Sequence, residues 1–188
     1  MQVNYPEGVF ASSGELFICD TNNHRVRKVL RNGQIVTICG TGEAGYNGTQ
    51  LHSPFAVFVS SSNQVYISEN FGHRIRKIDQ NGIIHTIAGT GHPEFNGGDQ
   101  LAIHATQDHP RGLFVSHDDS SIWIADSGNH CIRCIDLHGM ISTVAGNGEG
   151  GFNGDGQLAT LAFLQQPVCS NTGTSCSLPI VKIIALGR

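Results

Sequence analysis

Short apolar runs, separated by polar and glycine-rich turns, recur along the chain. The last copy shows four of them clearly: "GLFVS" from 112, "SIWIAD" from 121, "CIRCID" from 131 and "ISTVAG" from 141. Each run is short and rich in β-branched or aromatic residues, which is typical of β-strands. Several runs are apolar on both faces, as expected of a sheet that packs between two others. Helical periodicity is nearly absent, and only "GQLATLAFLQQP" from 156 predicts a short helical turn.

This four-strand pattern occurs three times, over about 6–49, 54–105 and 110–166. A unit of four strands in roughly 50 residues indicates a β-propeller blade, because solenoid repeats are shorter or helical. The extra length of the second unit falls in the connection "DQLAIHATQDHP", which is shortened to "TQLHSP" in the first unit. Length variation in a loop is expected if the strands are the fixed part. The sequence therefore predicts an all-β propeller of four-stranded antiparallel blades, three complete and a fourth begun.

Each unit also carries the same ordered motifs. "P-x-G-[VL]-x-[VA]" opens the unit, a "[LVI]-[FYW]-[IV]-[ACS]-[DE]" strand leads into "D-x-x-N-H-R-[VI]-R", and "T-[IV]-[AC]-G-[TN]-G" with a later "[YF]-N-G" follows. This set resembles the NHL repeat, a family named after Asn, His and Leu, of which this chain carries the Asn-His part. The resemblance covers Pro6 to about Pro167. It implies a six-bladed ring, so three blades make half of one. Either two copies form a homodimer that completes the ring, or the chain is a piece of a longer propeller.

The recurring acidic, Asn, His and Arg residues are predicted to be structural. Asp and Asn side chains can bond nearby backbone groups and fix the turn between the second and third strands. The His and Arg residues would then pack or bond at equivalent places in neighbouring blades, whereas a catalytic group would be expected once. The set comprises Asp20, Asn23, His24 and Arg27 in the first unit, Glu69, His73 and Arg76 in the second, and Asp126, Asn129, His130 and Arg133 in the third.

Two glycine-rich stretches, "GTGEAG" from 40 and "GNGEGG" from 146, fit the G-x-G-x-x-G pattern of dinucleotide sites. That site needs a helix that begins at the loop, and no helical pattern follows either stretch. These glycines are expected instead to let the connection run back over one face to the next blade. We therefore predict no cofactor.

The six cysteines are expected to be free thiols, with Cys19 and Cys39 as small core residues. Cys131 and Cys134 have the spacing of zinc ligands, but residues three apart on a strand point to opposite faces. Asp99 and Asp155 lack the acidic neighbours of a calcium site. No metal site is predicted from these spacings.

Composition narrows the function classes. The net charge is −4, with 11 Lys and Arg against 15 Asp and Glu, so no global basic excess favours nucleic acid or an anionic membrane. No apolar run reaches the length of a membrane span, and Met1 is not followed by a signal-like segment. We expect a soluble, cytoplasmic protein whose blades occupy 1–167. The tail, 168–188, departs from the repeat, although "IVKIIAL" from 180 could pair as a strand.

The leading functional hypothesis is a non-enzymatic scaffold that mediates protein–protein interaction. Aromatic side chains in glycine-rich loops are typical interface anchors. The alternative is that these rings cover the edges of the blades. Phe71 stands out because it interrupts an otherwise polar turn. The candidate contacts are Tyr46, Phe71, His92, Phe95 and Phe152.

Two other functions remain open at this point. RNA binding would need a basic stripe from Arg25, Arg27 and Lys28 with Arg74, Arg76 and Lys77, and Cys131 and Cys134 interrupt it in the third unit. The resemblance extends loosely to peptidyl-hydroxyglycine lyases, which hold zinc through histidines near the central channel. Here the loop residues His52, His104, His109 and His117 have no metal-ligand spacing, so enzymatic activity is not the expectation.

Overall fold

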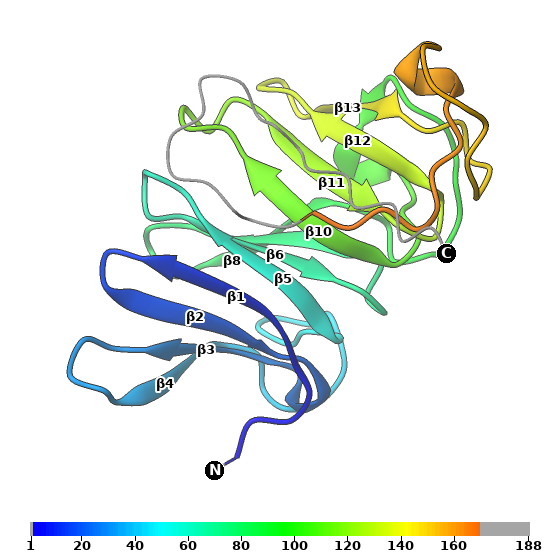
Figure 1. Cartoon of the computed structure of the whole chain (residues 1–188). Coiled ribbons are helices and arrows are strands. Elements are labelled where there is room, and N and C mark those ends of the chain that lie inside the picture. The colour runs from blue at the N-terminus through cyan, green and yellow to red at the C-terminus, as the bar shows by residue number, and fades with distance from the viewer. Residues whose placement is uncertain (1, 170–188) are drawn as a thin grey trace.

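The computed structural model describes residues 2–169, which form three antiparallel sheets arranged side by side (Figure 1). Blade 1 contains β1 (Pro6–Ser12), β2 (Glu15–Asp20), β3 (Arg25–Val29) and β4 (Ile35–Cys39). Blade 2 contains β5 (Pro54–Val59), β6 (Val65–Glu69), β7 (Arg74–Ile78) and β8 (Ile84–Ala88). Blade 3 contains β10 (Pro110–Val115), β11 (Ile122–Asp126), β12 (Cys131–Ile135) and β13 (Met140–Ala145). The predicted all-β propeller with four-stranded blades is confirmed.

Apolar side chains between successive blades form the core. One buried layer joins blades 1 and 2 and includes Phe17, Val26 and Ile67, and a second joins blades 2 and 3 and includes Ile75 and Ile124. The first strands of the blades are linked by aromatic rings, with centroids 4.7 Å apart for Phe10 and Phe58 and 5.5 Å apart for Phe58 and Phe114. Blade 2, which is apolar on both faces, is therefore covered by a neighbouring blade on each side.

The connection between blades 2 and 3 differs from the sequence prediction. The sequence predicts a loop there, but Gln100–Leu101 forms β9, which pairs with the outer strand β13 and makes blade 3 five-stranded. The outer strand of a blade exposes unpaired backbone groups, and the longer connection is able to cover them. Residues 2–169 also contain three short 3₁₀ turns, and one of them, Ala159–Leu161, lies where the sequence predicts a helical turn. Within the described part of the chain, no helix is long and apolar enough to cross a membrane.

The start of a fourth blade is visible at Pro167–Cys169. The Ser127 hydroxyl donates to the Pro167 carbonyl at 2.6 Å, and the equivalent bond joins blade 1 to the first proline of blade 2. Cys169 lies against Gly112 of β10, at the place where the first strand of a next blade would stand. The predicted strand at 180–186 and Cys176 lie outside the described residues.

Five cysteines lie in the described part of the chain, and all are free thiols. Cys19 and Cys39 are buried in the layer between blades 1 and 2, as predicted. Burial raises the pKa of the Cys39 thiol to about 11, so this thiol is protonated and unreactive at neutral pH.

Candidate functional site

The repeat histidine links each blade to the next. All three histidines adopt the left-handed region, with φ of 48° at His24, 51° at His73 and 52° at His130. In each blade the imidazole Nδ1 accepts the backbone N–H of the residue before the next blade's first proline. The three bonds are Ser53 N to His24 at 3.1 Å, His109 N to His73 at 3.2 Å and Gln166 N to His130 at 3.2 Å. The repeated histidine thus makes the same backbone bond at all three junctions.

The recurring acid and arginine form a buried ion pair in every blade. The distances are 3.5 Å for Asp20–Arg27, 3.1 Å for Glu69–Arg76 and 3.6 Å for Asp126–Arg133. Each acid also accepts a backbone N–H from the segment that enters its own blade, from Asn4 at 2.7 Å, His52 at 2.6 Å and Asp108 at 2.7 Å. These groups hold the incoming connection against the turn.

Asparagine side chains complete the turn in two blades. Asn23 donates to Asp20 at 2.8 Å and Asn129 donates to Asp126 at 2.9 Å. Blade 2 has Gly72 at this position. Burial raises the pKa of Asp126 to about 6, against the opposing effects of the Asn129 bond and of the Arg133 charge.

Close packing explains the glycines of the G-x-G stretches. Gly40 has a φ of 92°, and a Cβ there would lie 2.1 Å from the His24 carbonyl oxygen. The equivalent Gly89 and Gly146 make the same approach to the turns of blades 2 and 3. Gly42 leaves room for the Arg25 guanidinium. These contacts account for the glycine spacing.

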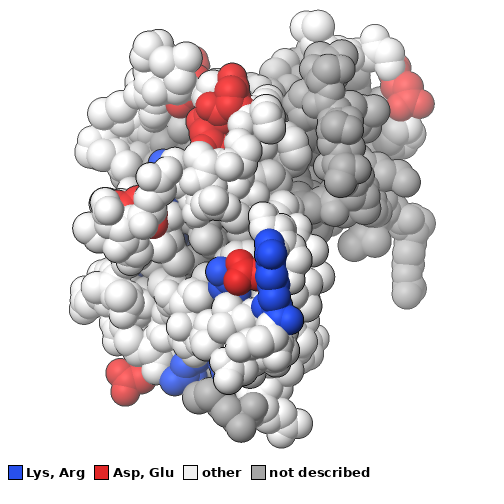
Figure 2. Space-filling view, turned by 90° about the vertical axis from the view of Figure 1, so that its left-hand side faces the viewer, with Lys and Arg blue, Asp and Glu red and all other residues white. Residues whose placement is uncertain are grey.

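The basic clusters of blades 1 and 2 are used in structural contacts. Arg74 donates to the Gly72 and Thr90 carbonyls at 2.9 and 2.7 Å, and Arg25 makes the corresponding bonds in blade 1. Lys28 is paired with Glu15 at 2.6 Å. On the described surface visible in Figure 2, basic side chains form small groups next to acidic ones and no continuous stripe.

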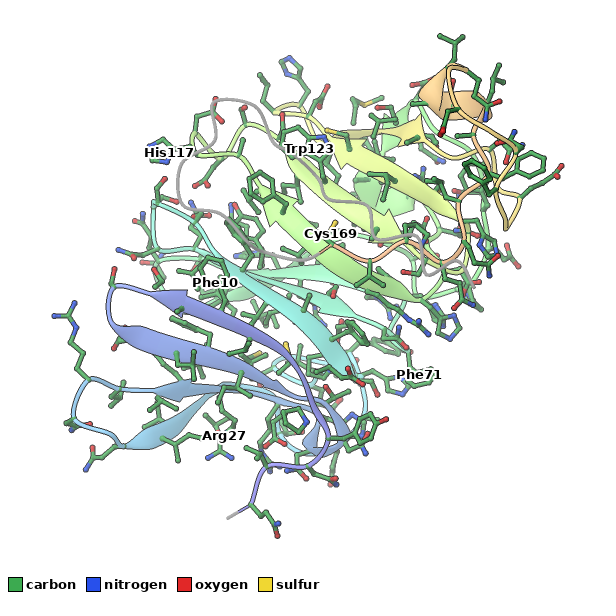
Figure 3. All side chains as sticks on the ribbon, in the orientation of Figure 1. Phe10, Arg27, Phe71, His117, Trp123 and Cys169 are labelled. Atoms are coloured by element: carbon green, nitrogen blue, oxygen red, sulfur yellow. The ribbon has the colours of Figure 1, made fainter. Side chains whose placement is uncertain are left out.

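A row of aromatic rings runs from the repeat turn of blade 1 to the residue before the first strand of blade 3. We call it the aromatic row; its members are His24, His52, Phe71, His109 and His73. Phe71 lies in the turn between β6 and β7, at the end of the molecule opposite His117 (Figure 3). Its side chain is 55 % exposed. The equivalent positions hold Asn22 in blade 1 and Gly128 in blade 3. The centroid distances along the row are 5.8 Å for His24–His52, 6.1 Å for His52–Phe71, 5.3 Å for Phe71–His109 and 4.8 Å for His109–His73.

Three histidines of the row favour the neutral form. Partial burial lowers the pKa of His24 and His52, and the charges of nearby Arg25 and Arg74 lower it further. Burial is also the largest cause of the lowered pKa of His73. A neutral Nδ1 is the form that can accept the backbone bonds described above.

One group of possible metal ligands occurs within residues 2–169. The ligand atoms of His73, Asp108 and His109 all lie within 4.8 Å of one another. Asp108 Oδ1 is 2.5 Å from His109 Nδ1 and 3.6 Å from His73 Nδ1. Sequence spacing missed this group because His73 lies in the preceding blade. An alignment of the three repeats could have revealed this group. In each repeat, the histidine contacts the residue that precedes the first proline of the following blade.

The remaining candidate contacts lie on separate connections between blades. Tyr46 is 62 % exposed and stacks on the Arg74 guanidinium at 4.5 Å, while Phe95 is 53 % exposed and lies 5.1 Å from that of Arg133. Each ring covers an arginine and still presents surface to solvent. His92 is also exposed, and Phe152, on the connection after β13, is 77 % exposed. Within residues 2–169, the ring contacts of Phe71 are to His52 and His109 and to none of these side chains.

Comparison with known protein families identifies the repeat at two places in the chain. The profile of the NHL repeat matches residues 3–29 and 108–135. The chain carries NHL repeats. Both matched ranges contain an Asn-His pair, whereas blade 2, with Gly72 before its histidine, lies outside them. A comparison with curated protein sequences finds no match.

Solved structures share the fold of this NHL-repeat chain. An auxiliary nutrient binding protein from Bacteroides ovatus is 16 % identical, with a TM-score of 0.66 over 90 % of this chain and 43 % of that one. A protein with the same description from Bacteroides thetaiotaomicron is 22 % identical, with a TM-score of 0.64 over 87 % and 42 %. Virginiamycin B lyase from Staphylococcus aureus is 18 % identical, with a TM-score of 0.55 over 76 % and 41 %. The chain spans less than half of each of these proteins, and the likeness concerns the fold alone.

Proposed function

We propose that this NHL-repeat propeller is a non-enzymatic scaffold that binds another protein at the end carrying the aromatic row. The observation that carries this proposal is the exposed ring of Phe71, which stands between His52 and His109 at centroid distances of 6.1 and 5.3 Å. A central exposed aromatic residue, surrounded by partly buried rings that exclude water, is the usual form of an interface hot spot.

The turn that carries Phe71 is held rigidly. On one side of it, Glu69 is buried and paired with Arg76. On the other side, His73 accepts the His109 N–H. A preorganised anchor loses little conformational entropy when a partner binds, which favours affinity. Tyr46, Phe95, His92 and Phe152 would extend the contact along the connections, each as an independent point of attachment.

RNA binding is the first alternative, and the contacts of the basic residues weaken it. Arg76 is buried against Glu69, and Arg74 is bonded to two backbone carbonyls. Few guanidinium groups of these two clusters are left to neutralise phosphates, which supply most of the affinity in nucleic-acid binding. A metal-dependent lyase is the second alternative. A likeness of fold at 18 % identity does not carry the activity of virginiamycin B lyase to this chain.

The test is a peptide-display selection on the purified chain, repeated with Phe71→Asn. This variant copies the residue that blade 1 has at the same turn, so the fold is expected to be retained. Selected peptides should bind at least about 10-fold more weakly to the variant, as expected for loss of a hot spot. Leu137→Ser, which removes an exposed apolar side chain from the turn between β12 and β13, is the matched control and should have little effect.

Two results would overturn the proposal. The first is that no selected peptide depends on Phe71. The second is that the chain binds a poly(U) oligonucleotide with an affinity that falls steeply with salt, which is the signature of RNA binding.

A further inference from the structure

We propose that His73, Asp108 and His109 form a binding site for a divalent transition-metal ion at the junction of blades 2 and 3. Two imidazoles and one carboxylate are brought within 4.8 Å by one repeat turn and one connection. This donor set suits zinc and similar ions, since imidazole nitrogen and carboxylate oxygen both bind them. Three protein ligands leave a fourth tetrahedral position for water or for a side chain of a bound partner.

The distances are close to those that such an ion requires. Metal–ligand distances of about 2.0–2.1 Å place two tetrahedral ligands about 3.3 Å apart. Asp108 Oδ1 and His73 Nδ1 are 3.6 Å apart, which is near this value. Asp108 Oδ1 and His109 Nδ1 are 2.5 Å apart because they share a hydrogen bond. An ion that replaces the shared proton needs this pair to separate by about 1 Å, which a side-chain rotation supplies.

Hydrogen bonds on both sides hold the backbone of Asp108 in place. The Asp108 N–H donates to the Asp126 carboxylate at 2.7 Å, and the Asp108 backbone carbonyl accepts the Gly128 N–H at 2.8 Å. A Cβ at Gly128 would lie 2.3 Å from Asp108 Oδ2, so a glycine at this position leaves room for the carboxylate. Ligands fixed by such surrounding bonds lose less freedom when they coordinate an ion.

The other two junctions lack this donor set. At the junction of blades 1 and 2, His24 meets His52 and Ser53, and after blade 3, His130 meets Gln165 and Gln166. Neither has a carboxylate at the place of Asp108. The site is therefore a local departure from the repeat. His73 already accepts the His109 N–H through Nδ1, and coordination exchanges this bond for the ion.

The experiment titrates the full chain with Co²⁺, whose visible absorption reports its coordination, and then displaces it with Zn²⁺. We expect one strong site per chain. Asp108→Asn and His109→Gln should each weaken binding by at least about 10-fold. The second variant copies Gln166 of the next junction. His24→Gln and His85→Gln are matched controls, because His24 makes the same backbone bond without a carboxylate and His85 lies in an exposed pair with Asp79.

A Co²⁺ ion bound at another site of the chain would not respond to the Asp108 and His109 substitutions. Binding that is unchanged in Asp108→Asn and His109→Gln, or the absence of any Co²⁺ binding at micromolar concentration, would overturn the inference. Thermal unfolding without metal must be the same for the wild type and both variants, so that loss of binding is not loss of fold. The inference does not depend on protein binding, because Phe71→Asn leaves all three ligands in place.

Discussion

Replacing Gln107 with leucine should stabilise the protein. Gln107 is fully buried in the connection between blades 2 and 3, close to the buried Ala105. Neither its amide nitrogen nor its amide oxygen has a hydrogen-bond partner within residues 2–169. The equivalent position of the first connection holds Leu51, which is also fully buried and belongs to the apolar core. A side chain of similar size without polar atoms is thus already accommodated at this place in the fold.

The magnitude follows from the cost of an unpaired buried amide. Mutational data place this cost at about 1–3 kcal/mol. Leucine removes that cost, so the free energy of unfolding should rise by about the same amount. In a chain of this size, 1 kcal/mol shifts the melting temperature by about 2–4 °C, which gives a total rise of about 2–12 °C.

Calorimetry and chemical denaturation of Gln107→Leu measure this change. The reverse exchange, Leu51→Gln, is the matched control and should destabilise by at least about 2 kcal/mol, because it loses apolar burial and adds an unpaired amide. A decrease in stability of 1 kcal/mol or more in Gln107→Leu would refute the reasoning. It would mean that the amide makes bonds that stabilise the folded chain.

Two further predictions concern the turns. Because the fold lowers the pKa of His24, His52 and His73 below the ordinary 6.5, their stabilising effect is complete above pH 6.5 and is lost as the pH falls below it. The melting temperature should therefore fall between pH 7.5 and pH 5.5, and an unchanged value would contradict this. Gly40→Ala should destabilise by about 2–4 kcal/mol, because it adds a clash with the His24 carbonyl to the strain of a positive φ. Gly33→Ala, with a φ of 83° and open space around it, should cost only about 1–2 kcal/mol in the same denaturation assay.

The local chemistry of the repeat determined much of this fold from the sequence alone. The blade strands of five to seven residues alternate with turns in which Asp, Asn and Gly residues bond or shape the backbone within a few positions. A single copy of the repeat therefore predicts a blade. Repetition also predicted a structural role for His24 and its equivalents, and all three histidines accept the same backbone bond. The buried roles of Cys19 and Cys39 were predictable for the same reason, since other copies have Ser or Ala at these positions.

The tertiary structure decided which repeat positions are buried by a neighbouring blade and which strands pair. Val9, Val57 and Leu113 occupy the same position of the repeat, yet Val9 is 60 % exposed and the other two are 1 % exposed. The difference arises because no blade precedes blade 1 within the described residues. The pairing of β9 with β13 is likewise set by the path of a long connection, which no local pattern encodes.

In the candidate sites too, some features follow from the local sequence and others from the tertiary structure. Phe71 was recognisable in the sequence as an apolar residue in a polar turn, because that signal is local. Its position between His52 and His109 required the fold, since those rings come from two different connections. The approach of His73 to Asp108 and His109 also bridges two blades. Sequence spacing detects ligands that share one turn or strand, whereas a junction between blades brings together residues whose distance only the packing of the blades determines.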